Sequence, residues 1–186
     1  MKKAVILHGT DGNPEGNWFP WLKNELENRG YEVWVPLLPD NHMPNRSVYN
    51  DFLFSSGWDL NDNVVIGHSS GAVEVLNLLM DPRCPHIKAG VLVGIWESTA
   101  DTPLDPQQFA SLFPPSGFDY QLIKEKAGGL LFVHGQDDPY CPLEQAQWMA
   151  ERTSSDIVIV PEGKHLGASF DRLPILLEAL ELRDLL

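Results

Sequence analysis

Short apolar runs rich in β-branched residues alternate along the chain with longer segments in which apolar residues recur at helical spacing. Most of these runs are continuous rather than alternating, which is typical of parallel strands buried on both faces. The expected strands cover residues 4–7, 33–35, 64–66, 91–93, 130–133 and 157–160. The expected helices cover about residues 17–29, 47–57, 71–80, 119–126, 142–152 and 169–185. This repetition predicts an α/β fold with a parallel sheet of about six strands and helices on both faces.

The chain of 186 residues has the length of one domain, so we expect residues 1–186 to fold as a single unit. One stretch, residues 96–118, interrupts the alternation of strands and helices and contains four prolines but no clear period. A connection of this length in a compact domain is usually functional. Because Trp96, Phe109 and Leu112 are apolar, we expect a short lid there, with a plain surface loop as the alternative.

The pentapeptide Gly-His-Ser-Ser-Gly at residues 67–71 lies between an expected strand and an expected helix. Ligands bind at the carboxyl ends of the strands in an open parallel sheet, so this position favours a functional site. Gly-x-Ser-x-Gly in this context is typical of a nucleophile elbow, a tight turn that exposes the oxygen of the central serine. A side chain in place of either glycine would collide with the neighbouring strand or helix. We therefore expect Ser69 to be a nucleophile.

A serine hydroxyl needs an adjacent base, and six histidines compete for this role. His165 follows the last expected strand and fits the chain order serine, acid, histidine. His8 and His134 lie at strand ends beside glycines, where we expect them to pack or to orient loops. A carboxylate must hold the base in one tautomer, and the candidates are Asp137 and Asp138. Adjacent carboxylates cannot both point into the site, so we expect the other one to structure its loop or face solvent.

An oxyanion hole needs a backbone donor from the loop after the first strand, besides the residue that follows the nucleophile. The expected pair is the N–H groups of Thr10 and Ser70. The glycine-rich loop at residues 9–16 lacks the Gly-Lys-Ser/Thr ending of a P-loop and the glycine spacing of a dinucleotide site. No cluster of His, Cys and carboxylate residues has metal spacing. We expect neither a cofactor nor a metal.

The composition argues against several kinds of partner. A formal net charge of −13 repels phosphate backbones, so nucleic acid is not expected. The sequence has no apolar run near 18 residues and no leader-like segment, so no membrane partner is expected. Cys84 and Cys141 are far apart and in no redox spacing, which favours a reducing compartment. We expect a cytoplasmic protein that is a monomer or a weak homodimer.

These residues together resemble the small α/β hydrolases of the retinoblastoma-binding-protein-9 and YdeN type over nearly the whole chain. The resemblance is carried by Asn-Trp-Phe-Pro-Trp-Leu-Lys-Asn-Glu-Leu at residues 17–26, by the elbow, by the Asp-Asp-Pro turn at 137–139 and by His165. It implies an α/β-hydrolase core without a large cap domain. It also implies a triad of Ser69, Asp138 and His165.

Many α/β hydrolases carry their acid in the pattern Gly-x-x-Asp-x-x-Val-Pro. Gly135, Asp138 and Pro142 match this pattern, whereas Cys141 replaces the valine. The Leu-x-Cys-x-Glu motif for retinoblastoma binding is absent around both cysteines, so that property does not carry over.

We expect hydrolysis of small carboxylic esters through an acyl-enzyme, with thioesters and amides as alternatives because one triad serves all three. Asn13, Trp18 and Trp96, together with other residues of the 96–118 segment, are expected to line a small acyl pocket. Two further classes stay open: a non-catalytic binding or regulatory protein on a hydrolase scaffold, and a cofactor-free acyltransferase or lyase. The presence of all three triad residue types in the right order favours the hydrolase.

Overall fold

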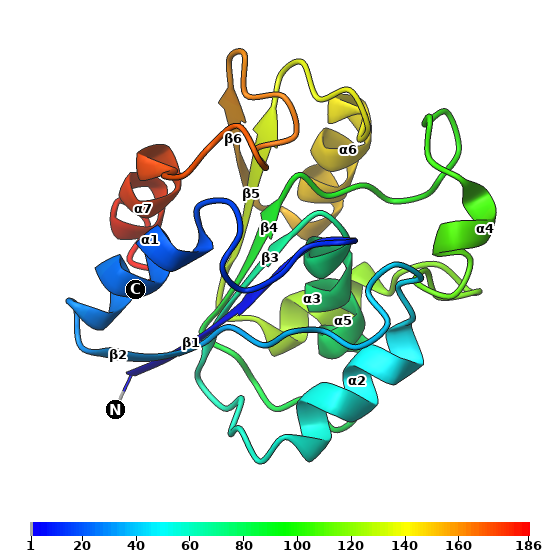
Figure 1. Ribbon diagram of the computed structural model, residues 1–186. Helices are drawn as coiled ribbons and strands as arrows, with labels where there is room; N and C mark the ends of the chain where they lie inside the picture. The colour runs from blue at the N-terminus through cyan, green and yellow to red at the C-terminus, as the bar shows by residue number, and fades with distance from the viewer. Residues whose placement is uncertain (1) are drawn as a thin grey trace.

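The computed structural model describes residues 2–186, and at its centre lies a parallel six-stranded sheet (Figure 1). The strands are β1 (Lys2–Leu7), β2 (Tyr31–Trp34), β3 (Val64–His68), β4 (Ala89–Val93), β5 (Leu130–Gly135) and β6 (Asp156–Val160). Their order across the sheet is β2-β1-β3-β4-β5-β6, and every neighbouring pair is parallel. The predicted sheet is therefore confirmed. Since the strands are parallel, the residues that follow β1, β3, β5 and β6 meet at one edge.

The helices are α1 (Phe19–Glu27), α2 (Arg46–Ser55), α3 (Ser70–Met80), α4 (Pro106–Phe109), α5 (Tyr120–Lys126), α6 (Leu143–Thr153) and α7 (Pro174–Glu181). Six of them lie where the apolar spacing predicts helices. The short α4 lies within residues 96–118, where no helix was expected. Its N-cap is Asp105, whose carboxylate accepts a hydrogen bond from the N–H of Gln107, and Pro106 occupies the first turn.

The expected start of the last helix, at residue 169, is wrong by five residues, since α7 begins at Pro174. Proline disfavours helical backbone in the residue before it, and Leu173 accordingly has φ −135° and ψ 68°. The residues between β6 and α7 form turns instead, with positive φ at Glu162, Lys164 and Leu166. This turn-rich loop carries His165.

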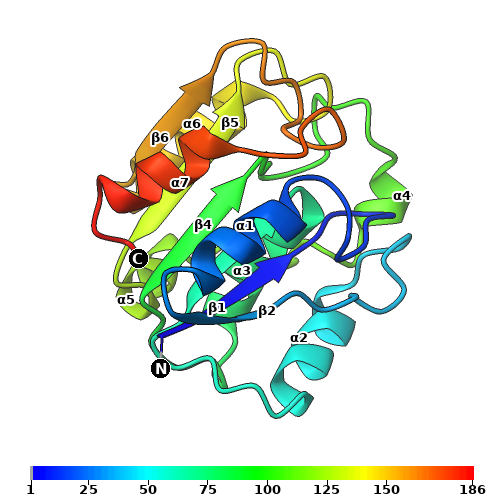
Figure 2. The same ribbon diagram turned by 60° about the vertical axis from the view of Figure 1, so that its left-hand side comes forward.

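The helices form a layer on each face of the sheet, as predicted. Helices α1 and α7 cover one face, and α2, α3, α5 and α6 lie on the other (Figures 1 and 2). Alternate strand residues feed the two cores: Val5 and Leu7 join the core beneath α3, whereas Ala4 and Ile6 join the core beneath α1 and α7. Within residues 2–186, no helix combines the length and hydropathy that crossing a bilayer would require.

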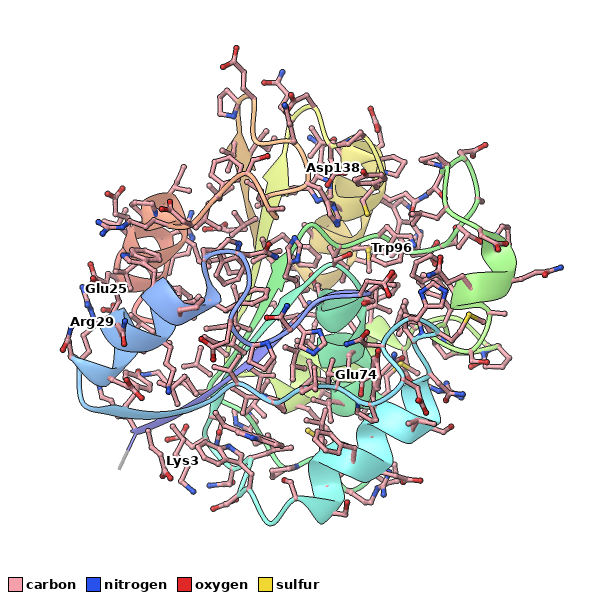
Figure 3. All side chains as sticks on the ribbon, in the orientation of Figure 1. Lys3, Glu25, Arg29, Glu74, Trp96 and Asp138 are labelled. Carbon is pink, nitrogen blue, oxygen red and sulfur yellow. The ribbon has the colours of Figure 1, made fainter. Side chains whose placement is uncertain are left out.

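Helix α3 is buried along most of its length, and one of its buried residues, Glu74, has an ionisable side chain. Glu74 is 0% exposed and lies among the side chains packed around α3 (Figure 3). Its Oε2 accepts a hydrogen bond from Asn77 Nδ2 at 3.3 Å, and its Oε1 has no partner within the described chain. Burial raises the pKa of the Glu74 carboxyl well above its ordinary value. Folding therefore shifts the Glu74 carboxyl toward its neutral form.

We expect Glu74→Gln to stabilise the protein in a pH-dependent manner. A raised pKa in the folded state means that the unfolded chain loses this proton first, so the wild-type free energy of unfolding falls as pH rises above about 4.5. Glutamine has no such proton to lose. The variant should gain about 1–3 kcal/mol over wild type at pH 8 and little at pH 4. Urea unfolding between pH 4 and 8 measures this difference.

The exposed Glu178 on α7 provides the control for this experiment. Glu178→Gln should change the free energy of unfolding by less than about 0.5 kcal/mol at every pH. A constant difference between Glu74→Gln and wild type across the pH range would contradict the expectation.

Candidate active site

Ser69 lies in the turn that joins β3 directly to α3. Its backbone has φ 57° and ψ −125°, a conformation that is strained for a residue with a side chain. A Cβ added at Gly67 would collide with the backbone of Gly71, and one added at Gly71 would collide with the carbonyl of Leu7. The glycines therefore permit the close approach of α3 to β1 and β3, as the sequence predicted, and the strained turn projects the serine oxygen at the sheet edge.

A hydrogen-bonded row joins three loops at this edge. His165 Nε2 lies 2.9 Å from Ser69 Oγ, and His165 Nδ1 lies 2.7 Å from Asp138 Oδ2. Ser69 follows β3, Asp138 follows β5, and His165 follows β6. The structure thus brings together the three residues that the family resemblance implies, in an arrangement suited to proton transfer from a hydroxyl to an imidazole.

The two adjacent aspartates have different environments. The Asp138 side chain is 0% exposed and bonds His165, whereas Asp137 is exposed and its Oδ1 accepts a hydrogen bond from the backbone N–H of Lys164 at 2.8 Å. Asp137 therefore holds the loop before His165. Asp138, rather than Asp137, therefore lies beside the imidazole of His165.

The carboxylate of Asp138 is held in its charged form. Burial by itself would raise its pKa, but the hydrogen bond from His165 and those from the N–H groups of Cys141 and Tyr140 outweigh this effect. The pKa of Asp138 consequently lies below its ordinary value. Asp138 Oδ1 accepts the two backbone bonds at 3.0 Å and 2.9 Å, which leaves Oδ2 for the imidazole.

Three other histidines support this edge of the sheet. His68 Nε2 lies 2.8 Å from the carbonyl oxygen of His165, to which it donates, and burial lowers its pKa to about 3, so that it stays neutral. His134 Nε2 similarly donates to the carbonyl oxygen of Cys141 at 2.9 Å. The buried His8 accepts a hydrogen bond from the N–H of Leu38. Each thus orients a loop, as expected for His8 and His134.

Thr10 lines the same pocket as Ser69, and Ser70 is the next residue along the chain. Thr10 Oγ1 donates a hydrogen bond to Ser70 Oγ at 3.0 Å, which ties the loop after β1 to the start of α3. Within residues 2–186, neither the Thr10 N–H nor the Ser70 N–H donates to another group. The Ser70 N–H also stands in the first turn of α3, where helix N–H groups favour negative charge. Both donors remain available for an oxyanion.

Ser69 opens into a pocket of about 330 Å³. Its lining residues are Thr10, Asp11, Ser69, Trp96, Leu104, Gln108, Phe109, Tyr140, Cys141 and His165. The lining combines an apolar wall from residues 96–109 with polar groups next to the serine. A pocket of this volume is at the small end of those that hold organic ligands.

Of the three residues expected to line the pocket, Trp96 does so, and the predictions for Asn13 and Trp18 are wrong. Trp18 is 0% exposed, and its Nε1 donates to the carbonyl oxygen of Leu166 at 2.8 Å, so it supports the loop of His165 from the core. Asn13 Oδ1 instead accepts from the N–H of Glu15 and structures its own turn.

Sequence reasoning missed Tyr140, Cys141 and Asp11 as pocket residues. Tyr140 is 48% exposed, and its ring centre lies 5.3 Å from that of His165. All three follow strand ends within a few residues, and this position alone could have identified them.

Residues 96–118 are anchored over the pocket by several hydrogen bonds. Gln108 Nε2 donates to the carbonyl oxygen of His42, and the backbone N–H of Arg46 donates to the carbonyl oxygen of Ser111. Beneath them, Trp96 is 0% exposed, and its ring centre lies 5.4 Å from that of Phe109. The apolar residues of this segment therefore pack inward, which gives the pocket a wall.

Comparison with known sequences agrees with this geometry. The sequence model of the family described as serine hydrolase matches residues 4–181. YdeN of Bacillus subtilis (strain 168) is 25% identical over 182 residues, which cover 96% of this chain and 94% of the relative. The serine hydrolase RBBP9 of Rattus norvegicus is 24% identical over 158 residues, which cover 83% of this chain and 82% of that protein. The resemblance seen in the sequence is thereby confirmed.

Solved structures show the same fold. The crystal structure of the ydeN gene product from B. subtilis matches with a TM-score of 0.85 at 24% identity, and the match covers 97% of both chains. Est1E from Butyrivibrio proteoclasticus, bound to ferulic acid, matches with a TM-score of 0.74 at 16% identity, covering 100% of this chain and 88% of that chain. These matches confirm the α/β-hydrolase fold.

Proposed function

The chain belongs to the serine hydrolase family, and on this basis we propose that it hydrolyses small carboxylic esters through an acyl-enzyme on Ser69. The observation that carries the proposal is the hydrogen-bonded row at the sheet edge. Its two distances, 2.9 Å from His165 Nε2 to Ser69 Oγ and 2.7 Å from His165 Nδ1 to Asp138 Oδ2, suit general-base catalysis.

In the first half of the reaction, Ser69 Oγ attacks the ester carbonyl carbon while His165 Nε2 takes the hydroxyl proton. The buried Asp138 carboxylate stabilises the imidazolium that forms. The free N–H groups of Thr10 and Ser70 receive the negative oxygen, and each such donor typically stabilises the transition state by about 3 kcal/mol. His165 then gives its proton to the departing alcohol.

In the second half, His165 accepts a proton from water, which attacks the acyl carbon. His165 then returns this proton to Ser69 Oγ as the acyl–oxygen bond breaks, so that the acid is released and the hydroxyl is restored. Thioesters and amides pass through the same steps. Esters are preferred over amides in the proposal because an alcohol leaves more readily than an amine, whereas thioesters stay an alternative.

The pocket supports a preference for short acyl groups. Its volume of about 330 Å³ is small, and Trp96, Leu104 and Phe109 lie on its wall. In this proposal, residues 96–118 act as a short lid whose side chains limit the length of the acyl chain. Asp11 also lines the pocket, and its negative charge favours neutral over anionic substrates.

We expect p-nitrophenyl esters from acetate to octanoate to be hydrolysed with the largest kcat/KM at acetate or butyrate. Leu104→Ala should raise the octanoate-to-acetate ratio of kcat/KM by about tenfold, because each added methylene in an apolar pocket contributes about 1–3 kcal/mol. Initial rates across the ester series measure both expectations.

Leu182, which is 82% exposed, provides the matched control. Leu182→Ala should leave the chain-length profile unchanged. The proposal fails if the wild-type protein cleaves none of these esters, and the assignment of the wall fails if Leu104→Ala leaves the profile as it was.

A further inference from the structure

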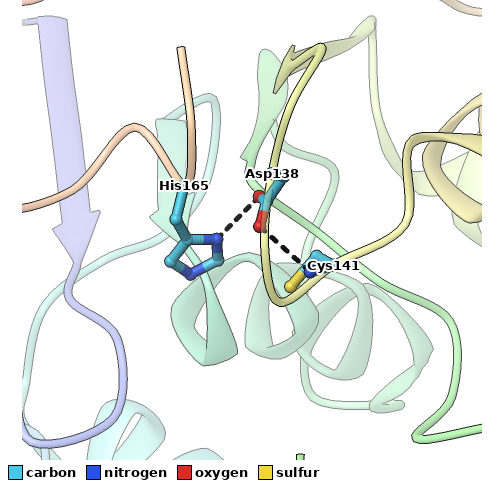
Figure 4. Close-up of side chains that lie close together, drawn as sticks. All are labelled: Asp138, Cys141 and His165. Atoms are coloured by element: carbon cyan, nitrogen blue, oxygen red, sulfur yellow. Dashed lines mark hydrogen bonds and ion pairs between the residues drawn. The ribbon is translucent and has the colours of Figure 1, made fainter. Parts of the chain in front are cut away.

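A cysteine stands next to the acid and the base of the hydrogen-bonded row. Asp138, Cys141 and His165 each offer one ligand atom, and these atoms all lie within 4.8 Å of one another (Figure 4). Asp138 and Cys141 share the loop after β5, whereas His165 comes from the loop after β6. A carboxylate, a thiol and an imidazole thus lie close together, although the spacing of these three residues along the sequence is not typical of a metal site.

We infer that Asp138, Cys141 and His165 form a site for a thiophilic divalent cation such as Zn²⁺, and that occupation of this site switches the hydrolase off. The inhibitory effect rests on the proposed function, whereas cation binding does not. The site is distinct from a resident cofactor, because no step of ester hydrolysis needs the ion.

The donor set fits zinc better than harder cations. Sulfur and imidazole nitrogen favour Zn²⁺ over Mg²⁺ and Ca²⁺, which prefer oxygen ligands. With three protein ligands and one water, Zn²⁺ takes a tetrahedral geometry with bonds of about 2.0–2.3 Å, so neighbouring ligand atoms lie about 3.3–3.7 Å apart. For all three atoms to bind one ion, the 2.7 Å between His165 Nδ1 and Asp138 Oδ2 must lengthen slightly and the thiol must approach.

The surroundings hold the ligands and leave a path to them. Asp138 is oriented by the N–H groups of Tyr140 and Cys141, an arrangement that commonly supports metal ligands. Cys141 is only 1% exposed, but it lines the pocket together with His165 and Ser69. An ion can therefore reach the thiol from the space that receives the substrate.

Binding would remove the base by changing its tautomer. In the free protein, His165 Nδ1–H donates to Asp138 and Nε2 accepts from Ser69. Zn²⁺ takes the Nδ1 lone pair, so the imidazole proton moves to Nε2, and the Cys141 thiol releases its proton to solvent as the sulfur–metal bond forms. Nε2 then carries a proton and cannot accept the one from Ser69 Oγ.

The first test measures inhibition of ester hydrolysis by Zn²⁺, with each variant compared with its own metal-free rate. Micromolar Zn²⁺ should inhibit the wild type, EDTA should restore activity, and millimolar Mg²⁺ should have no effect. Cys141→Val should raise the Zn²⁺ concentration for half-inhibition by at least about tenfold. The matched variant Cys84→Val replaces the other buried cysteine and should stay as sensitive as the wild type.

The second test measures binding without activity. Co²⁺ added to Ser69→Ala protein should produce a thiolate-to-metal charge-transfer band in the near ultraviolet at one ion per chain, and this band should disappear in the Ser69→Ala/Cys141→Val double variant. Absence of the band, or equal Zn²⁺ sensitivity of Cys141→Val and wild type, would overturn the inference. If no ester is cleaved yet the Co²⁺ band appears, the proposed function fails and the cation site stands.

Discussion

Replacement of Ser69 by alanine is expected to lower kcat for ester hydrolysis by about 10⁶-fold. In a triad that acts as a unit, loss of the nucleophile removes nearly all of the chemistry and leaves only binding and oxyanion stabilisation. The alanine methyl group fits the space of the serine side chain, so the strained turn at φ 57° should be retained. Steady-state rates with a short p-nitrophenyl ester measure the loss, and labelling by a fluorophosphonate probe measures the nucleophile itself.

Ser70 is the natural control for this experiment. Its side-chain oxygen accepts a hydrogen bond from Thr10 and does not contact His165, so Ser70→Ala should still be labelled by the probe. Near-normal turnover in Ser69→Ala, or labelling of Ser69→Ala at the wild-type rate, would remove Ser69 from the mechanism.

Replacement of Asp138 by asparagine is expected to lower kcat by about 10⁴-fold. The amide of asparagine can donate a hydrogen bond to His165 Nδ1, which leaves the imidazole proton on Nε2 and prevents it from accepting the proton of Ser69. The charge that stabilises the imidazolium is also lost. The folded-state pKa of Asp138 lies below its ordinary value, so wild-type kcat should not decline through titration of this carboxyl until the pH is below the ordinary aspartate range.

The variant Asp137→Asn tests whether Asp137 and Asp138 have different roles. Asp137 accepts a hydrogen bond from the Lys164 N–H through Oδ1, and asparagine keeps an oxygen that can accept the same bond. We expect kcat to fall by less than about tenfold, since the loop that carries His165 should keep its conformation. A larger loss in Asp137→Asn than in Asp138→Asn would reverse the proposed roles, and pH–rate profiles of both variants would show which carboxylate acts on the imidazole.

The cation site and the triad would share two residues, so their tests inform each other. Asp138→Asn should weaken Zn²⁺ binding as well as catalysis, whereas Cys141→Val should weaken Zn²⁺ binding alone relative to its own activity. This difference distinguishes the thiol from the carboxylate, even though both lie within 4.8 Å of His165.

The sequence predicted much of the fold because its information is local. Continuous apolar runs such as residues 64–66 mark strands buried on both faces, and the helical spacing after residue 71 marks α3. The error at the start of α7 had a local cause as well, namely the effect of Pro174 on Leu173. The elbow could also be predicted from the sequence, because the close approach of backbone atoms around Ser69 requires its two glycines.

By itself, the sequence determined the strand–helix order, the elbow at Ser69, and the chain order that singles out His165. Chain order left Asp137 and Asp138 open and the family resemblance implied Asp138, which the tertiary structure places beside the imidazole. Only the tertiary structure decided that Trp18 is buried behind the site and that Cys141 lies beside the acid and the base. The physical reason is that these relations join loops that are distant along the chain. Hydrophobic periodicity fixes which segments enter the sheet, but the direction of a loop side chain depends on contacts that form only after β3, β5 and β6 lie in one sheet.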